Sequence, residues 1–288
     1  MQDNPLPWLE KNFGFMGAHS DYKACSKVIL GLPMDSTTSF RPGTRLAPAR
    51  IRGVSEGIEE FSIYQKRSLL DINFYDGGDI VVPFGNVAES LNRIEQTVES
   101  ILKQDKQTVC IGGEHLVSLP VIKAYRRRYP DLVVVQMDAH ADLRKDYLGE
   151  ELSHATVMRH VVEVIGPRRL YQLGIRSATE DELLFAESNT RLYLDQLSDA
   201  VDDVKQQAGS RPVYVTLDID VLDPAFAPGT GTPEPGGFSS RELLRVLHSL
   251  AELDVVGFDL VEVAPPYEKG DNTSILGAKI IREALLAF

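Results

Sequence analysis

The chain has 288 residues, of which 43% are apolar and 25% are charged, and its formal net charge is −12. This composition is that of a globular protein with a sizeable core, and the acidic charge argues against binding to nucleic acid or to an anionic membrane, which needs clusters of Lys and Arg. The two cysteines, Cys25 and Cys110, are too few for a disulfide scaffold, so we expect a reducing, cytoplasmic location.

Short β-branched runs alternate with segments of helical periodicity. In chain order, the sequence predicts a strand at Lys27–Leu32, a helix at Ala47–Glu60, a strand at Ile72–Tyr75, a helix at Ala88–Lys103, a strand at Thr108–Ile111, a helix at Leu116–Tyr129, a strand at Leu132–Met137, a helix at Ala155–Ile165, strands at Arg169–Gly174, Arg191–Leu194 and Val213–Leu217, a helix at Ser239–Leu250, a strand at Val255–Leu260 and a helix at Thr273–Leu286. Strands separated by helices form βαβ units, which indicates an α/β fold with a parallel sheet covered on both faces.

No repeat, low-complexity tract or clear linker divides the sequence, so we predict one domain over residues 1–288. The segment Pro224–Phe238 contains four Pro and four Gly, and it is therefore expected to be neither a helix nor a central strand. A domain linker is one interpretation, but the acidic residues directly before this segment favour a loop beside a functional site.

Side chains of the kind that bind metals follow a predicted strand. The apolar run Leu132–Met137 leads directly into Asp138, His140 and Asp142. In extended backbone, positions i, i+2 and i+4 point to one face, so the three side chains are expected to project together. In parallel α/β sheets, ligands bind outside the carboxyl ends of the strands, which is where these residues fall.

Two other strand ends carry the same residue types. Asp218 and Asp220 follow the strand Val213–Leu217, and His115 follows a Gly-Gly pair (112–113) that allows a tight turn. Taken alone, each segment is also explained by a turn, a helix cap or a packed histidine. Together they supply four carboxylates and two imidazoles, and clustered carboxylates repel one another unless two divalent cations neutralise them. Such ligands without thiolate favour Mn²⁺ over structural zinc.

Several segments between Gly112 and Tyr267 form a family pattern: GGEHLVS, DAHADLR, LSHAT, TLDIDVLDPAFAPGTGTPEPGG and DLVEVAPPY. With FRPGTRLAPARIR (Phe40–Arg52) and GIRSATEDE (Gly174–Glu182), they resemble the ureohydrolase family of arginase and agmatinase, most closely its bacterial agmatinase subgroup. The resemblance implies a three-layer α/β/α sandwich with a central, mainly parallel sheet of about eight strands. It also implies two Mn²⁺ per subunit and a homo-oligomer, either a trimer or a hexamer.

Carried onto this sequence, the resemblance implies roles for individual residues. The six metal ligands are His115, Asp138, His140, Asp142, Asp218 and Asp220. A hydroxide that bridges the metals is the expected nucleophile, and Asp142 is expected to bridge the metals and to accept the proton of the hydroxide. His154 corresponds to the proton shuttle, with a helix-start histidine as the alternative. Glu262 is expected to bind the substrate guanidinium, with an ordinary salt bridge as the alternative.

The loop Leu143–Ser153 bears on the substrate. It has no Asn or Thr, whereas arginase holds the α-amino and α-carboxylate groups of its substrate with a stretch rich in such residues, and it carries three acidic residues. We therefore predict that the substrate is agmatine, which ends in an ammonium group and yields putrescine and urea in polyamine biosynthesis. Arg144 and Lys145 are either solvated charges or contacts for a carboxylate, as in 4-guanidinobutyrate.

Alternative functions remain. A different ureohydrolase would act on 4-guanidinobutyrate or on a related guanidino or formimino compound. A non-catalytic relative that binds metal or polyamine would have lost ligands or the shuttle, and none is lost here. A nucleic-acid-binding module is disfavoured by the acidic charge.

Overall fold

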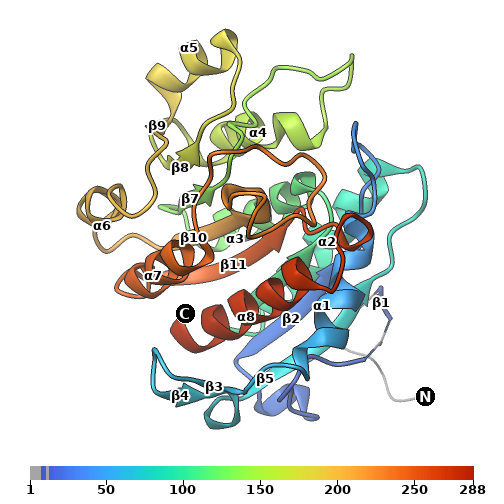
Figure 1. Ribbon diagram of the computed structural model, residues 1–288. Coiled ribbons are helices and arrows are strands. Elements are labelled where there is room, and N and C mark those ends of the chain that lie inside the picture. Colours follow the sequence, from blue (N-terminus) through green and yellow to red (C-terminus); the bar gives the residue numbers. More distant parts are fainter. Residues whose placement is uncertain (1–7, 11–12) are drawn as a thin grey trace.

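The computed structural model describes residues 8–10 and 13–288 (Figure 1). Within them, the main sheet has nine strands in the order β1 (Leu9–Glu10), β5 (Phe74–Ile80), β2 (Lys27–Leu32), β6 (Gln107–Gly112), β11 (Val255–Val261), β10 (Val213–Asp218), β7 (Val133–Met137), β8 (Leu170–Ile175) and β9 (Arg191–Leu194). All neighbouring strands pair in parallel except β1 and β5, which are antiparallel. The mainly parallel sheet is as predicted.

Helices cover both faces of this sheet. One hydrophobic core lies under α1 (Ala47–Ser55), α6 (Val201–Ala208), α7 (Ser240–Leu250) and α8 (Asn272–Ala287), and the other lies under α2 (Val87–Leu102), α3 (Ser118–Arg128) and α4 (Val157–Ile165). In Figure 1, α1, α7 and α8 lie in front of the sheet and α3 lies behind it. Along β7, Val133 and Val135 face the first core and Val134 faces the second, because successive side chains point to opposite faces. The three-layer α/β/α sandwich is therefore confirmed.

The eight predicted strands are all present, and the differences have local causes. Strand β5 extends to Ile80, beyond the predicted end at Tyr75. The prediction stopped early because the run DGGD is polar and glycine-rich and lacks the pattern of a strand. The helix that begins at Ala47 ends at Ser55 rather than at Glu60. The sequence analysis missed α5 (Glu180–Asn189), which buries only two residues and so has no apolar periodicity, and α6, which is short. It also missed β1 and the hairpin of β3 (Phe61–Ser62) and β4 (Arg67–Ser68), since two-residue strands carry little pattern.

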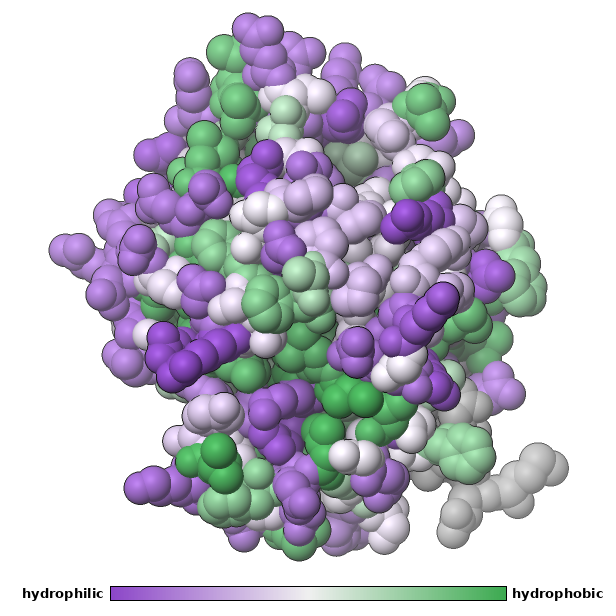
Figure 2. All heavy atoms as spheres, viewed as in Figure 1, coloured by the Kyte–Doolittle hydropathy of each residue, from purple (hydrophilic) through white to green (hydrophobic). Residues whose placement is uncertain are grey.

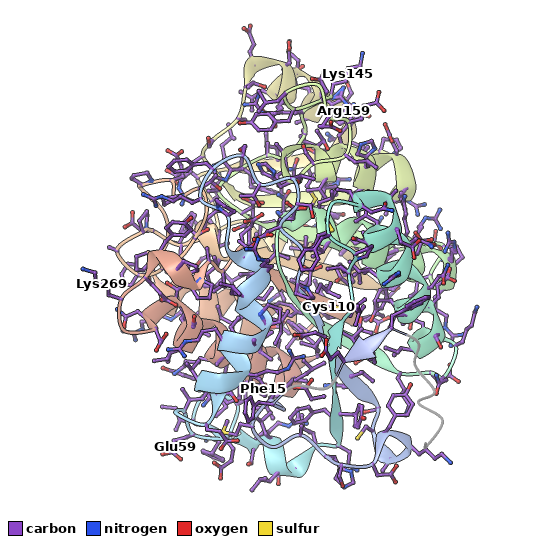
Figure 3. The ribbon with its side chains drawn as sticks, turned by 90° about the vertical axis from the view of Figure 1, so that its right-hand side faces the viewer. Phe15, Glu59, Cys110, Lys145, Arg159 and Lys269 are labelled. Atoms are coloured by element: carbon purple, nitrogen blue, oxygen red, sulfur yellow. The ribbon has the colours of Figure 1, made fainter. Side chains whose placement is uncertain are left out.

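The surface and the interior agree with the composition. Hydrophilic residues cover most of the face in Figure 2, and hydrophobic ones gather in its lower middle, where Figure 1 has α8. Figure 3 places Cys110 in the middle of the molecule, and both cysteines are buried and unpaired. No helix in the described part of the chain is long and apolar enough to span a membrane.

Candidate metal centre and active site

Four neighbouring strands in the middle of the sheet, β6, β11, β10 and β7, end at one edge. The last residue of β10 and the segments that follow the four strands carry all six predicted metal ligands and Glu262. Four stretches that are far apart in the sequence therefore meet because of the strand order, in the position where parallel sheets bind ligands.

One group of side chains surrounds His115, which is 1% exposed. Its Nδ1 atom lies 3.0 Å from Asp138 Oδ2, 3.1 Å from Asp142 Oδ2 and 3.4 Å from Asp218 Oδ2. His115, Asp138 and Asp218 offer ligand atoms that lie within 4.8 Å of one another, so they are able to hold a metal ion.

A second group with the same property consists of Asp138, His140 and Asp220. His140 Nδ1 lies 3.0 Å from Asp220 Oδ2 and 3.7 Å from Asp138 Oδ1. Asp138 belongs to both groups, and Asp142 approaches only His115. Asp138 is therefore the residue that the two groups share, and the expected bridging role of Asp142 stays a prediction.

The backbone after β7 also differs from the expectation. Strand β7 ends at Met137, and Asp142 has a left-handed backbone with φ of 54°, so the three ligands do not project from one extended segment. Asp138 Oδ1 accepts a hydrogen bond from the His140 amide at 2.6 Å, which turns the chain. The turn brings Asp142 back to His115. Left-handed backbone in a non-glycine residue is uncommon and concentrates at functional sites.

Gly113, two residues before His115, allows two backbone segments to approach each other closely and is not required for a special turn. A Cβ atom on Gly113 would lie 1.9 Å from Met34 O, so only glycine fits there. The Gly113 carbonyl accepts a hydrogen bond from the Glu262 amide at 2.9 Å, and Glu262 Oε1 accepts one from the His115 amide at 2.7 Å. Glu262, also left-handed with φ of 62°, is thereby fixed beside the first group.

The carboxylates of these groups have no Arg or Lys partner among the described residues, and, against the opposing effect of burial, the aspartates raise the pKa of both imidazoles, that of His140 to about 12. Within the described residues, their ion pairs are with imidazoles and not with Arg or Lys. Burial, and then the charge of Asp138, raises the pKa of Asp142 to about 7. Burial, and then the charges of Asp220 and Asp138, raises the pKa of Asp218 well above its usual range. These shifts are the ones expected of carboxylates that need further positive charge.

A hydrogen-bonded chain fixes the tautomer of His115. Thr216 Oγ1 donates to Asp259 Oδ1 at 2.6 Å, so its oxygen is left to accept the His115 Nε2–H at 3.0 Å. In the neutral imidazole that a cation would bind, the lone pair is then on His115 Nδ1, which is buried without a hydrogen-bond partner of suitable geometry among the described residues. A lone pair aimed at three carboxylate oxygens is the arrangement that a divalent cation completes. The sequence analysis missed Thr216, although its position two residues before Asp218 places it on the same face of β10.

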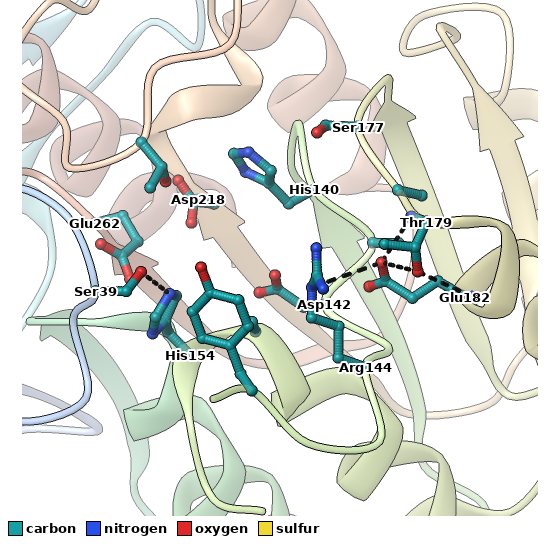
Figure 4. A pocket seen from close by; sticks show the side chains of 15 residues that line it. Ser39, His140, Asp142, Arg144, His154, Ser177, Thr179, Glu182, Asp218 and Glu262 are labelled. Atoms are coloured by element: carbon teal, nitrogen blue, oxygen red, sulfur yellow. Dashed lines mark hydrogen bonds and ion pairs between the residues drawn. The ribbon is translucent and has the colours of Figure 1, made fainter. Parts of the chain in front are cut away.

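A cavity of about 270 Å³ opens beside both groups (Figure 4). His140, Asp142 and Asp218 lie in the middle of it, His154 and Glu262 on one side, and Arg144 and Glu182 on the other; all seven line it. Burial lowers the pKa of His154 to about 4, so its imidazole is neutral at pH 7. Burial, together with the charge of Glu114, raises the pKa of Glu262 to about 8.

The loop Leu143–Ser153 contributes to the cavity differently from what was expected. Its acidic residues are all exposed and do not line the cavity, whereas Arg144 does. Figure 3 places Lys145 at the outer end of the molecule. The carboxylate nearest to Arg144 is Glu182, whose Oε2 lies 4.0 Å from Arg144 Nε. Sequence reasoning missed Glu182, because it comes from α5 and not from a strand end.

The Pro/Gly segment that follows Asp220 forms a loop, as favoured above. Arg176 fastens this loop, since its Nη2 donates to both the Asp220 and the Glu234 carbonyl oxygens at 2.7 Å. Asp223 Oδ2 accepts from the Gly236 amide at 2.8 Å. One loop residue, Thr232, lines the cavity.

Known proteins share this chain's sequence and fold. The model of the arginase family matches residues 26–287. The agmatinase of Bacillus subtilis (strain 168) is 49% identical over 277 residues, which cover 95% of this chain and 96% of that protein. The agmatine ureohydrolase of Thermoplasma volcanium has a TM-score of 0.87 at 30% identity, with 96% and 94% of the two chains covered. The proclavaminate amidino hydrolase from Streptomyces clavuligerus has a TM-score of 0.88 at 34% identity, with 98% of each chain covered. The chain therefore belongs to the arginase family.

Proposed function

We propose that this chain is a manganese-dependent agmatinase, which hydrolyses agmatine to putrescine and urea in polyamine biosynthesis. The proposal rests on one cavity. Residues of both metal-binding groups line it, and so do the side chains of His154 and Glu262. The similarity to a bacterial agmatinase over 95% of the chain supports the choice of substrate.

Two divalent cations fit the donor set. His115, Asp142 and Asp218 would hold one with Asp138, which the second shares with His140 and Asp220. The unpartnered His115 Nδ1 supports this assignment, and oxygen and imidazole ligands suit Mn²⁺. When bound, the two metals lower the pKa of water and so supply hydroxide at neutral pH.

The chain's own residues orient the substrate and move the proton. Glu262 accepts hydrogen bonds from the guanidinium, which fixes its carbon toward the nucleophile. A C–O bond forms at that carbon, and the C–N bond to the butylamine chain breaks. After the attack, Asp142 accepts the proton of the hydroxyl group that has been added to the carbon, and His154 carries it to the departing nitrogen. Because its imidazole is neutral at pH 7, His154 acts as a carrier that first accepts the proton.

The far end of the cavity holds one positive and one negative side chain. Glu182 favours the ammonium group of agmatine, whereas Arg144 favours a carboxylate, as in 4-guanidinobutyrate or another guanidino acid. Urea release from agmatine, arginine and 4-guanidinobutyrate by the Mn²⁺-loaded protein, compared as kcat/KM, tests the substrate. We expect a preference for agmatine. A preference for 4-guanidinobutyrate that Arg144→Met removes would instead assign Arg144 to carboxylate binding, and no urea from any of the three would contradict the proposed function.

We propose a cytoplasmic location, because the two buried cysteines are unpaired. Family membership also supports a homo-oligomer, either a trimer or a hexamer. Light scattering on the eluting protein measures the mass of the assembly. A monomer at micromolar concentration would contradict this part of the proposal.

A further inference from the structure

The segment after β2 lies directly against the segment after β6. The Gly113 amide donates to the Leu32 carbonyl oxygen at 2.9 Å, and the Glu114 amide donates to the Met34 carbonyl oxygen at 2.8 Å. These bonds continue the pairing of the two strands beyond their ends. They place Thr37, on the first segment, over the side chain of Glu114.

Glu114 is fully buried and holds this segment through one carboxylate oxygen. Its Oε2 atom accepts hydrogen bonds from the Thr37 amide and the Thr37 hydroxyl, both at 2.9 Å, and from the Thr38 hydroxyl at 3.3 Å. The single hydroxyl proton of Thr37 is therefore directed at Glu114, and the lone pairs of Thr37 Oγ1 point elsewhere.

Those lone pairs face His154. Thr37 Oγ1 accepts a hydrogen bond from the His154 amide at 3.0 Å and lies 3.5 Å from the ring atom Nδ1. Because Thr37 has no proton left to donate, this contact requires the proton of the neutral imidazole to be on Nδ1. The other ring nitrogen, Nε2, lies 3.5 Å from Ser39 Oγ, which lines the cavity (Figure 4). The Tyr147 ring packs edge-on against the imidazole, with ring centroids 5.6 Å apart.

We propose that Thr37, held by Glu114, is a positioning residue that sets the orientation and the tautomer of His154. With Nδ1 protonated, Nε2 presents its lone pair to the cavity and is the atom that accepts and passes on the proton. The inference rests on the proposed function, in which His154 carries that proton. Thr37 acts through His154 and does not touch the reacting atoms.

The first test replaces Thr37 in the metal-loaded protein. We expect Thr37→Val to lower kcat for agmatine by roughly 10–100-fold, the effect of a misplaced catalytic group, with KM and metal content unchanged. Thr37→Ser should restore kcat, because it keeps the hydroxyl. Thr38→Val is the matched control, since Thr38 donates to the same Glu114 oxygen without a contact to His154 in the described structure. A loss in Thr38→Val equal to that in Thr37→Val would overturn the proposal.

A double-mutant cycle separates positioning from general damage. If Thr37 acts through His154, then adding Thr37→Val to His154→Ala should lower kcat no further. An equal loss of kcat in the wild-type and His154→Ala backgrounds would mean that Thr37 acts independently of His154, which contradicts the inference.

The tautomer itself is measurable without any substrate. Solid-state ¹⁵N spectra of histidine-labelled protein, loaded with diamagnetic Zn²⁺, distinguish protonated from unprotonated ring nitrogens, and His154→Ala identifies the signal among the six histidines. We expect Nδ1–H in the wild type and a shift toward Nε2–H in Thr37→Val. An Nε2–H tautomer in the wild type would overturn the inference even if Thr37→Val does not fold. Absence of urea release by the wild type would contradict the proposed function and leave this measurement valid.

Discussion

Two clusters of buried charged side chains in this protein differ in how their carboxylates are paired. In the first, between α1 and β5, the Arg52 guanidinium is 1% exposed and grips Asp76 with two hydrogen bonds, Nε to Oδ2 at 2.8 Å and Nη2 to Oδ1 at 3.0 Å. It also pairs with Asp79 and donates to the Gly78 carbonyl oxygen at 3.0 Å. The carboxylates of this cluster therefore have a cation supplied by the chain itself.

The second cluster, at the carboxyl edge of the sheet, has no Arg or Lys partner in the part of the chain that the structure describes. Its four aspartates pair with two imidazoles within the described residues, and burial with mutual repulsion raises the pKa of two of them. Buried carboxylates therefore do not by themselves indicate a metal site; several of them clustered around imidazoles, without an Arg or Lys partner, do. We therefore expect the first cluster to stabilise the fold and the second to bind cations from solution.

The largest expected effect follows from the shared position of Asp138. In Asp138→Asn, both metal-binding groups lose a ligand, so we expect loss of both metals and of urea release. Metal analysis after dialysis, combined with the urea assay, checks this. Asp76→Asn, which alters the other cluster, should retain both metals. Full metal content in Asp138→Asn would contradict the assignment.

His154 lines the same cavity but belongs to neither metal-binding group. We expect His154→Ala to keep two metals and to lower kcat by roughly 10²–10⁴-fold, the usual contribution of general acid–base catalysis. Loss of metal from this variant would show that His154 is a ligand and not a proton carrier.

Arg52 should matter for stability and not for metal binding. Removing one partner of a buried ion pair leaves a charge uncompensated, so Arg52→Met is expected to lower the free energy of unfolding by about 3–5 kcal/mol. Arg128→Met, which breaks an exposed pair with Asp105, should cost less than about 1 kcal/mol. Denaturant unfolding of metal-free protein measures both. A change in metal content for Arg52→Met would remove the distinction between the clusters.

The smallest effect is a pH dependence of the metal-free protein. The folded pKa of Asp142 is raised to about 7 and that of Glu262 to about 8, so the folded state binds more protons than the unfolded state between about pH 4 and 8. The stabilisation that these two groups contribute is therefore complete below pH 4, and it is lost as the pH rises through 7 and 8. We expect the melting temperature to fall by roughly 5–10 °C over this window, and Mn²⁺ to remove the fall. A melting temperature that rises with pH in the metal-free protein would contradict this.

Short motifs at strand ends made the clustering of the six side chains predictable, because residues close in sequence revealed both the residue types and their place in the sheet. The strands themselves followed from apolar runs such as Leu132–Met137. The turn that gives Asp142 a φ of 54° has no sequence signal of its own, so the three side chains after β7 were expected to project from one extended segment, which they do not.

Contacts between distant segments were not predictable. Thr37 and His154 are 117 positions apart. They meet because β2 lies beside β6 and the turn that follows β6 packs against the turn that begins at His154. Glu182 reaches the cavity from a helix without apolar periodicity. Arg144 lines the cavity and its neighbour Lys145 does not, because the loop directs the two side chains differently. Strand order and loop direction, which decide these contacts, are not encoded in local patterns.

The most direct test of the second cluster is the number of Mn²⁺ ions that the chelated protein binds, measured by calorimetric titration and by elemental analysis after dialysis. Two ions per chain are expected for the wild type and for Arg52→Met, and none for Asp138→Asn. No bound ion in the wild type, or two ions in Asp138→Asn, would contradict the assignment of this cluster as a two-metal centre.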